Sequence, residues 1–203
     1  TINKLIVGFD YTITGHAYKC TDCSEESNIP DSDNYTVTTL AGQAGVTGTT
    51  NGQGTAARFN KPPGIALDSS GNVYVADRDN HMIRKIDSSG NVTTLAGSGS
   101  AGSTNGQGTA ALFNQPQGVA VDSSGNVYVG DHKNHLIRKI DSFGNVTTLA
   151  GQAGVAGSPM GEALMPSFIH PKVAEVTTLE TVFVGSQRHT FSERVTPLVT
   201  VTH

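Results

Sequence analysis

The sequence predicts an all-β protein in which a unit of four short antiparallel strands is repeated, and three observations support this fold class. The first is self-similarity, because the segment 51–60 returns as 105–114 and the segment 68–75 returns as 122–129, with the same offset in both cases. The second is composition, with 24 glycines, abundant Thr and Val, and only 15% charged residues, which favours short strands and tight turns. The third is the turn sequence Asp-Ser-Ser-Gly-Asn between apolar runs. Four short strands at a fixed period are typical of β-propeller blades.

Each strand of the first clear copy follows from local sequence. Apolar and β-branched runs bounded by turn residues predict four strands, at Gly64–Leu67, Asn72–Ala76, His81–Ile86 and Asn91–Leu95. In each Asp-Ser-Ser-Gly-Asn turn, Asp can bond the turn backbone and Gly can adopt a positive φ. Both faces of the second strand are apolar, which predicts a sheet packed on both sides, as in a blade between two neighbours.

The repeat divides the chain into four parts of one propeller-like domain. The second and third parts are the clear blades, and the last is a degenerate blade in which His189 follows His135 at the repeat offset and Thr190 comes one position later. The first is a partial or degenerate blade that contains a Cys-x-x-Cys insertion. The predicted boundaries are 1–36, then 37–97 including a preceding strand and loop, then 98–151, and finally 152–203.

Two segments of the repeat carry a family resemblance. Asn80-His-Met-Ile, Asn134-His-Leu-Ile and the Gly-Asn-Val-Tyr-Val runs resemble the bacterial form of the NHL repeat. The resemblance implies a β-propeller, usually of six blades. Because the chain offers two clear blades, one degenerate blade and one partial blade, three interpretations stay open. The chain is a fragment, a four-bladed variant, or a protomer that another chain completes.

Charge and hydropathy exclude two classes of partner. The net charge is −4 and the sequence pI is about 5.9, whereas a nucleic-acid binder usually carries a basic excess. No run of 18 or more apolar residues is present, so we expect no membrane span. The repeated Arg-Lys pairs at 84–85 and 138–139 point to opposite faces of a strand, and we expect their charged heads to lie in solvent. The start at Thr1, without Met or a leader, is typical of a processed or excised piece.

The cysteines and the glycosylation motifs are isolated signals. Cys20 and Cys23 form a single Cys-x-x-Cys, which favours a short-range disulfide over free thiols or over metal or redox chemistry. Three Asn-x-Thr sequons occur, at Asn34, Asn91 and Asn145, and the latter two belong to the repeated turn. The sequence leaves open whether they are glycosylated.

The candidate binding residues all lie in or beside the repeated Asn-His motif. We expect them to tie blade turns together by hydrogen bonds. They are Asp77, Asn80, His81, Asp131, Asn134 and His135. One alternative is a calcium site formed by the Asp and Asn oxygens. The other follows from the NHL resemblance, because the peptide-amidating lyases of that family bind zinc through histidines, for which His81, His135 and His189 are the candidates here.

The chain ends and the motifs together predict the function. Residues 1–18 and 177–202 are rich in strand formers and predict a protein partner or self-association through terminal strands, or else pairing of the two ends within one chain. No nucleophile elbow or phosphate loop is present. We therefore predict a non-catalytic, cofactor-free bacterial binding or assembly module, extracellular or on the cell surface, and a subunit of an oligomer or filament completed by strand exchange. The alternatives are a zinc-dependent lyase-like enzyme and a ligand-sensing domain of a larger receptor.

Overall fold

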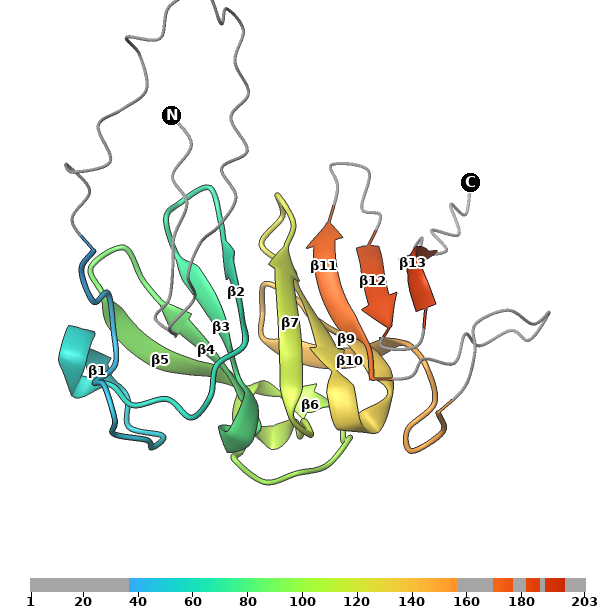
Figure 1. Ribbon diagram of the computed structural model, residues 1–203, viewed down its shortest axis with the longest axis horizontal. Coiled ribbons are helices and arrows are strands. Elements are labelled where there is room, and N and C mark those ends of the chain that lie inside the picture. The colour runs from blue at the N-terminus through green and yellow to red at the C-terminus, as the bar shows by residue number, and fades with distance from the viewer. Residues whose placement is uncertain (1–36, 157–169, 177–181, 187–188, 196–203) are drawn as a thin grey trace, which may run out of the picture. The chain divides into compact units, whose positions relative to one another are not determined.

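The computed structural model describes residues 37–156, 170–176, 182–186 and 189–195 (Figure 1). Residues 1–40 and 41–203 form separate units. The predicted partial blade at 1–36, with its cysteines and Asn34, lies outside the described residues. Of the two terminal segments proposed to pair, 1–18 also lies outside them, and 177–202 is described at 182–186 and 189–195. Residues 37–40 are not in a strand, although a strand was predicted to precede the first clear blade.

The first sheet confirms the four predicted strands to within a residue. It contains β2 (Gly64–Leu67), β3 (Val73–Asp77), β4 (Met82–Ile86) and β5 (Asn91–Ala96), each antiparallel to the next. A fifth strand was not predicted: the two-residue β1 (Gly52–Gln53) pairs with the outer side of β5. The glycine-rich segment before each blade therefore takes part in the sheet that follows it.

The second sheet repeats this arrangement, as the constant offset of the repeat requires. Its strands in spatial order are β6 (Gly106–Gln107), β10 (Asn145–Ala150), β9 (Leu136–Ile140), β8 (Val127–Asp131) and β7 (Pro116–Val121). The glycine-rich segment 97–113 between the two sheets contains β6, which pairs with β10. This segment closes the edge of its own sheet as well as joining two sheets.

A third sheet lies in the part of the chain where the degenerate repeat was predicted. It has three described strands, in the order β11 (Lys172–Val176), β12 (Val182–Ser186) and β13 (His189–Val195). Four residues separate β8 from β9, but only two separate β12 from β13. The Asn-His turn of the clear blades therefore has no equivalent of the same length here. The start of β12 lies one position beyond the repeat offset from the start of β8, and after the shorter turn Ser186 pairs with His189 as Asp131 pairs with Leu136. His189 therefore corresponds to Leu136, and neither His189 nor Thr190 takes the place of His135.

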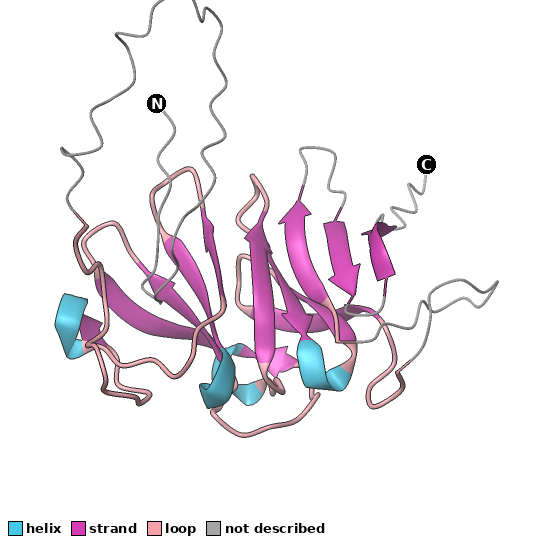
Figure 2. Ribbon diagram, viewed as in Figure 1, coloured by secondary structure: helices cyan, strands magenta, loops and turns pink. Residues whose placement is uncertain are grey.

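The hairpin turns form as their sequences predict. The Asp68 carboxylate accepts hydrogen bonds from the backbone N–H groups of Ser70 and Asn72, both at 2.9 Å, and Gly71 has a φ of +82°. The same Asp-centred turn recurs after Asp87, Asp122 and Asp141. Single-turn 3-10 helices also recur: η4 (Arg78–Asn80) follows β3 and η6 (His132–Asn134) follows β8 (Figure 2). Two more, η3 (Gly54–Ala56) and η5 (Gly108–Ala110), follow the short strands.

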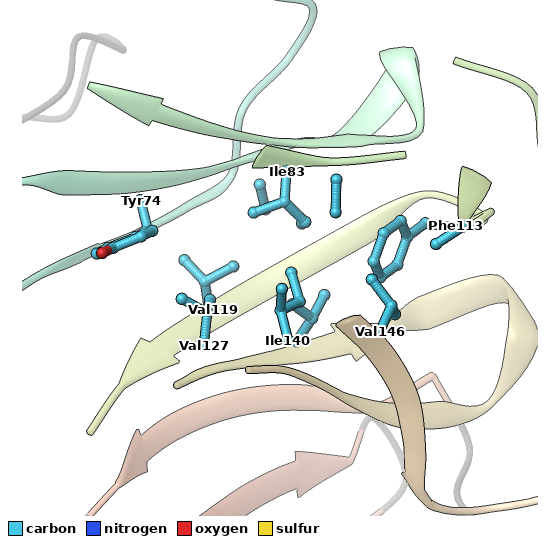
Figure 3. Close-up of a cluster of buried hydrophobic side chains, with 11 residues drawn as sticks. Tyr74, Ile83, Phe113, Val119, Val127, Ile140 and Val146 are labelled. Atoms are coloured by element: carbon cyan, nitrogen blue, oxygen red, sulfur yellow. The ribbon is translucent and has the colours of Figure 1, made fainter. Parts of the chain in front are cut away.

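The hydrophobic core lies between successive sheets. Tyr74 and Ile83 of the first sheet pack with Phe113, Val127 and Ile140 of the second, as Figure 3 shows. A second cluster joins the second and third sheets through residues of β7, β8, β9, β10 and β12. Each fully buried side chain of this size contributes about 1.5–3 kcal/mol to stability. The first strands β2, β7 and β11 are neighbours in turn, as in successive propeller blades (Figure 1). Within the described residues no helix is long and apolar enough to cross a membrane.

Candidate functional site

The motif residues of the first sheet meet in a buried polar network at the end of β3. Asp77, which ends this strand, is fully buried. One carboxylate oxygen accepts the Asn60 backbone N–H at 2.7 Å. The other accepts Asn80 Nδ2 at 2.9 Å and Arg84 Nη1 at 2.8 Å. Every contact is a protein N–H donor, so the positive charge that faces Asp77 is the guanidinium of Arg84.

The second sheet contains the same network at the equivalent positions of the next repeat. Asp131 accepts the Asn114 backbone N–H and Asn134 Nδ2, both at 2.7 Å, and Arg138 Nη1 at 3.0 Å. The amide nitrogens of Asn80 and Asn134 also donate to backbone carbonyls of the preceding glycine-rich segments. In both sheets the Asp and Asn side chains of the motif are therefore hydrogen-bonded to each other.

The arginines were the residues that sequence reasoning misjudged. Arg84 and Arg138 were expected to hold their heads in solvent, yet both are 0% exposed. Arg84 donates to the Arg58 carbonyl at 3.0 Å, the Thr50 carbonyl at 3.1 Å and Asn51 Oδ1 at 2.7 Å. The guanidinium also lies 5.2 Å from the centroid of the Phe59 ring. The sequence offered one signal for this burial, because an Asp lies seven positions before the Arg in both copies of the repeat.

Each arginine therefore fastens the glycine-rich segment to its sheet. Arg138 repeats the three contacts, with the Leu112 carbonyl, the Thr104 carbonyl and Asn105 Oδ1. A guanidinium has five N–H donors in a fixed planar arrangement, and here its Nη1 and Nη2 groups donate to acceptors on different segments. The lysines that follow behave differently, because Lys85 Nζ and Lys139 Nζ lie 5.7 Å from the rings of Tyr74 and Tyr128.

Burial dominates the electrostatics of both networks. Burial raises the pKa of Asp77 above its ordinary value, and it raises the pKa of Asp131 to about 6, although the N–H donors act in the opposite direction. Burial likewise lowers the pKa of Arg138, against the attraction of Asp131. Removing one member of such a pair leaves the other charge buried without compensation, which is strongly destabilising.

The motif histidines join one sheet to the next. His81 and His135 each follow a 3-10 turn and adopt the left-handed conformation, with φ of 56° and 60°. His81 Nδ1 accepts the backbone N–H of Gln115 at 3.0 Å, and His135 Nδ1 accepts that of His170 at 3.2 Å. The two histidines therefore lie in two separate joints between sheets. In each joint the imidazole connects two turns by a hydrogen bond, which is the kind of contact that the sequence predicted.

The described part of the chain contains no group of three or more His, Cys, Asp or Glu side chains placed to hold a metal ion. His189 begins β13, and its side chain is outside what the structure describes. One histidine that the sequence analysis did not single out, His170, lies beside His135 and His132. Only the fold brings these three together, because no spacing rule links residue 170 to the motif.

Two family models match this chain. The NHL repeat model matches residues 113–140, and the model of the Teneurin NHL domain matches residues 40–109. The first of these ranges includes the Asp131 network and His135. The second includes the Asp77 network and His81.

Similar curated proteins cover about half of the chain. NHL repeat-containing protein 2 of Bos taurus is 40% identical over 98 residues, which is 46% of this chain and 14% of that protein. SUPPRESSOR OF QUENCHING 1 of Arabidopsis thaliana is 37% identical over 95 residues, or 46% of this chain and 9% of that protein. The chain thus spans only a small part of the length of these relatives.

Solved structures agree with the fold. A structural genomics protein from Bacteroides thetaiotaomicron has a TM-score of 0.51 and 31% identity, covering 57% of this chain and 30% of that one. An auxiliary nutrient binding protein from the same organism has a TM-score of 0.53 and 22% identity, covering 66% and 36%. With the repeated networks and the histidine joints, the two family models over residues 40–109 and 113–140 and the NHL repeat-containing relatives support an NHL-repeat family, and an NHL-repeat propeller supports a binding or scaffold module in general.

Proposed function

We propose that this chain is a non-catalytic module for binding and assembly, completed by β-strands from a second copy or from a partner protein. The observation that carries the proposal is the edge of the third sheet. In the first two sheets, β5 and β10 pair along the strand that corresponds to β13. Within the described ranges, β13 is the last strand of its sheet. An open strand edge presents backbone N–H and C=O groups to which another strand can add.

The size of the chain relative to solved propellers supports the same proposal. The chain covers 30% and 36% of the two propeller chains that it resembles. A ring of that length would take further blades, supplied by another copy or by another part of a longer protein. Because the contacts between sheets recur with the repeat, a further blade could pack against the last one through the same kind of contacts.

A structural role for the motif residues supports the non-catalytic part of the proposal. Both carboxylate oxygens of Asp77 and of Asp131 accept hydrogen bonds from the protein. His81 Nδ1 and His135 Nδ1 accept backbone N–H groups. These atoms would have to leave their partners to act as bases or metal ligands. Stoichiometric zinc in the purified chain, measured by elemental analysis, would contradict this part.

We extend the proposal to a location outside the cytoplasm, supported by the predicted disulfide between Cys20 and Cys23. Thiol titration of the denatured chain, purified under alkylating conditions that prevent later oxidation, tests it. We expect no free thiol, whereas two free thiols would count against an oxidising location.

A peptide competition tests strand addition at β13. The probe is a synthetic peptide of residues 141–151, which contains β10, the strand that fills the equivalent position in the second sheet. We expect this peptide to bind in proportion to concentration and to lower the native mass of the assembled protein. The matched control is a scrambled peptide of the same composition. Equal effects of the two peptides, or no effect of either, would refute strand addition at this edge.

A further inference from the structure

Three imidazoles meet where the second sheet joins the third. The rings of His132 and His170 are stacked, with centroids 4.3 Å apart and planes at 11°. The ring of His135 lies 5.0 Å from that of His170, at 29°. His135 Nδ1 also accepts the His170 backbone N–H at 3.2 Å. We call His132, His135 and His170 the histidine cluster.

The joint between the first and second sheets has the same backbone arrangement but different side chains. Gln115 occupies the position of His170, and its φ of 54° resembles the 49° of His170. Arg78 occupies the position of His132, so His81 is the single imidazole of this joint. The next residue also differs, because Asp79 of the first joint is replaced by Lys133 in the second. Asp79 forms ion pairs with Lys61 at 2.9 Å and with Arg78 at 3.5 Å.

We propose that the second of these joints is an acid-sensitive release point: protonation of the histidine cluster frees the third sheet from the second, while the first joint stays closed. This inference concerns the stack of sheets itself and goes beyond the proposed assembly. It holds whether or not a partner strand adds at β13.

Acid acts on the second joint in two ways. His135 in its neutral form uses the Nδ1 lone pair to accept the His170 N–H, and a proton on Nδ1 removes that acceptor. Positive charges on stacked rings also repel each other at short range. Burial, followed by the proximity of His170 and Lys133, holds the pKa of His135 below its ordinary value, which shows that the folded joint disfavours the charged form.

Among the described side chains, His170 and Lys133 act on the charge of His135, and both disfavour its protonated form. Lys133 on η6 is positive, and Asp131 at the end of β8 is paired with Arg138 of β9. The sequence of β7 contains no charged residue, and neither does the segment 152–156. In its sequence β11 carries one charge of each sign, Lys172 and Glu175. At the first joint, by contrast, Gln115 and Arg78 replace two of the three imidazoles, so the described residues of this joint include no stacked pair of imidazoles.

Release would expose an apolar face. The cluster between the second and third sheets contains buried side chains from both, namely Ala120, Tyr128, Ile137, Ala150, Val182 and Val184. Separation of the third sheet would uncover these residues together with new strand edges. The joint would then convert a change of pH into a change of binding surface.

Hydrogen exchange of the whole chain at about pH 7.5 and about pH 5 tests the proposal, because this range spans the ordinary imidazole pKa. After correction for intrinsic exchange rates, we expect protection of the β11 and β12 amides to fall by about tenfold or more at the lower pH. We expect the β2 and β3 amides to keep their protection. A uniform loss in all three sheets, or no loss in β11 and β12, would overturn the proposal.

Two reciprocal substitutions, at equivalent positions of the two joints, provide matched variants. His170→Gln gives the second joint the residue of the first, with a side chain that already occupies this backbone conformation at Gln115. We expect this variant to keep the third sheet protected at about pH 5. Gln115→His makes the reciprocal change, and we expect it to make the first joint acid-sensitive. If His170→Gln does not fold, the reciprocal variant still decides, because an unchanged first joint would refute the role of stacked imidazoles.

Discussion

At the scale of single residues, the two buried arginines connect the sheets to the segments that precede them. Arg84 reaches three acceptors on the segment 50–58 while it is paired with Asp77. A lysine could not make these contacts, because its single ammonium group lacks the planar fork. The family motif therefore combines a carboxylate, an amide and a guanidinium in one buried unit.

Arg84→Met and Lys85→Met should have different effects on stability. Loss of the guanidinium leaves the Asp77 carboxylate buried without a counter-charge, so we expect Arg84→Met to cost about 3–5 kcal/mol. Lys85 is half-buried above the Tyr74 ring, and we expect its replacement to cost about 1 kcal/mol or less. Urea unfolding of the two variants measures the difference. Similar losses would show that the buried pair does not stabilise the sheet.

The Tyr74 hydroxyl should titrate well above the ordinary range. Burial and the hydrogen bond that this hydroxyl donates to Asp68 at 3.1 Å raise the pKa of Tyr74 to about 12. Because the folded state favours the neutral phenol, this group adds stability below about pH 10 that is lost as the pH rises towards 12. The tyrosinate absorbance of the native chain minus that of Tyr74→Phe isolates the group. A difference curve with a midpoint near 10 would contradict the burial of this hydroxyl.

At the scale of elements, one glycine allows the chain after the last strand of a blade to lie close to the turn that contains the motif histidine. Gly97 follows β5 with a φ of +96°, and a Cβ there would lie 2.6 Å from the His81 carbonyl oxygen. Gly90, in the turn before β5, has a φ of +81° and no atom within 4 Å of such a Cβ. Both positions strain an L-residue, but only Gly97 adds an overlap with backbone.

Gly97→Ala should therefore destabilise the chain more than Gly90→Ala. We expect the Gly90 variant to lose about 1 kcal/mol from backbone strain, and the Gly97 variant to lose about 2 kcal/mol more because backbone must move. Thermal unfolding of the pair tests this expectation. Equal losses would mean that the His81 turn adjusts freely and is not held by the joint.

The strands and hairpin turns were predictable because their causes are local. Alternating apolar residues and the Asp-Ser-Ser-Gly-Asn turns specify β2 to β5 without reference to the rest of the chain. Strand alternation also places Arg84 and Lys85 on opposite faces, but it does not say what covers each face. The sequence offered Asp77 as a counter-charge for Arg84, but the covering segment 50–60 is far away in sequence and could be identified only from the fold.

The joints between sheets were only partly predictable for the same reason. A role for His81 and His135 in tying turns could be inferred from their place in the repeat. Their partners, Gln115 and His170, are 34 and 35 residues away and take part through backbone N–H groups, which no side-chain pattern reveals. The short strands β1 and β6 were missed because two residues of Gly and Gln give no strand signal.

At the scale of the whole molecule, stability depends on contacts between neighbouring sheets. Each described sheet buries apolar side chains against the next, and each joint adds a histidine contact. In such an array every blade needs a neighbour, so the energetics resemble those of repeat proteins. The edge at β13, which is the last described strand of its sheet, and the proposed acid-sensitive joint then concern the same sheet, where we expect assembly to begin and to be reversed.

The native mass of the purified chain, measured by light scattering at several concentrations, distinguishes an assembly completed by added strands from a single chain. Completion by a second copy predicts a mass above the 21.1 kDa of one chain, either as a discrete multimer or rising with concentration. Addition of a partner protein should raise the mass of a chain that remains monomeric alone. A constant mass of 21.1 kDa at every concentration, unchanged by the β10 peptide, would contradict the account.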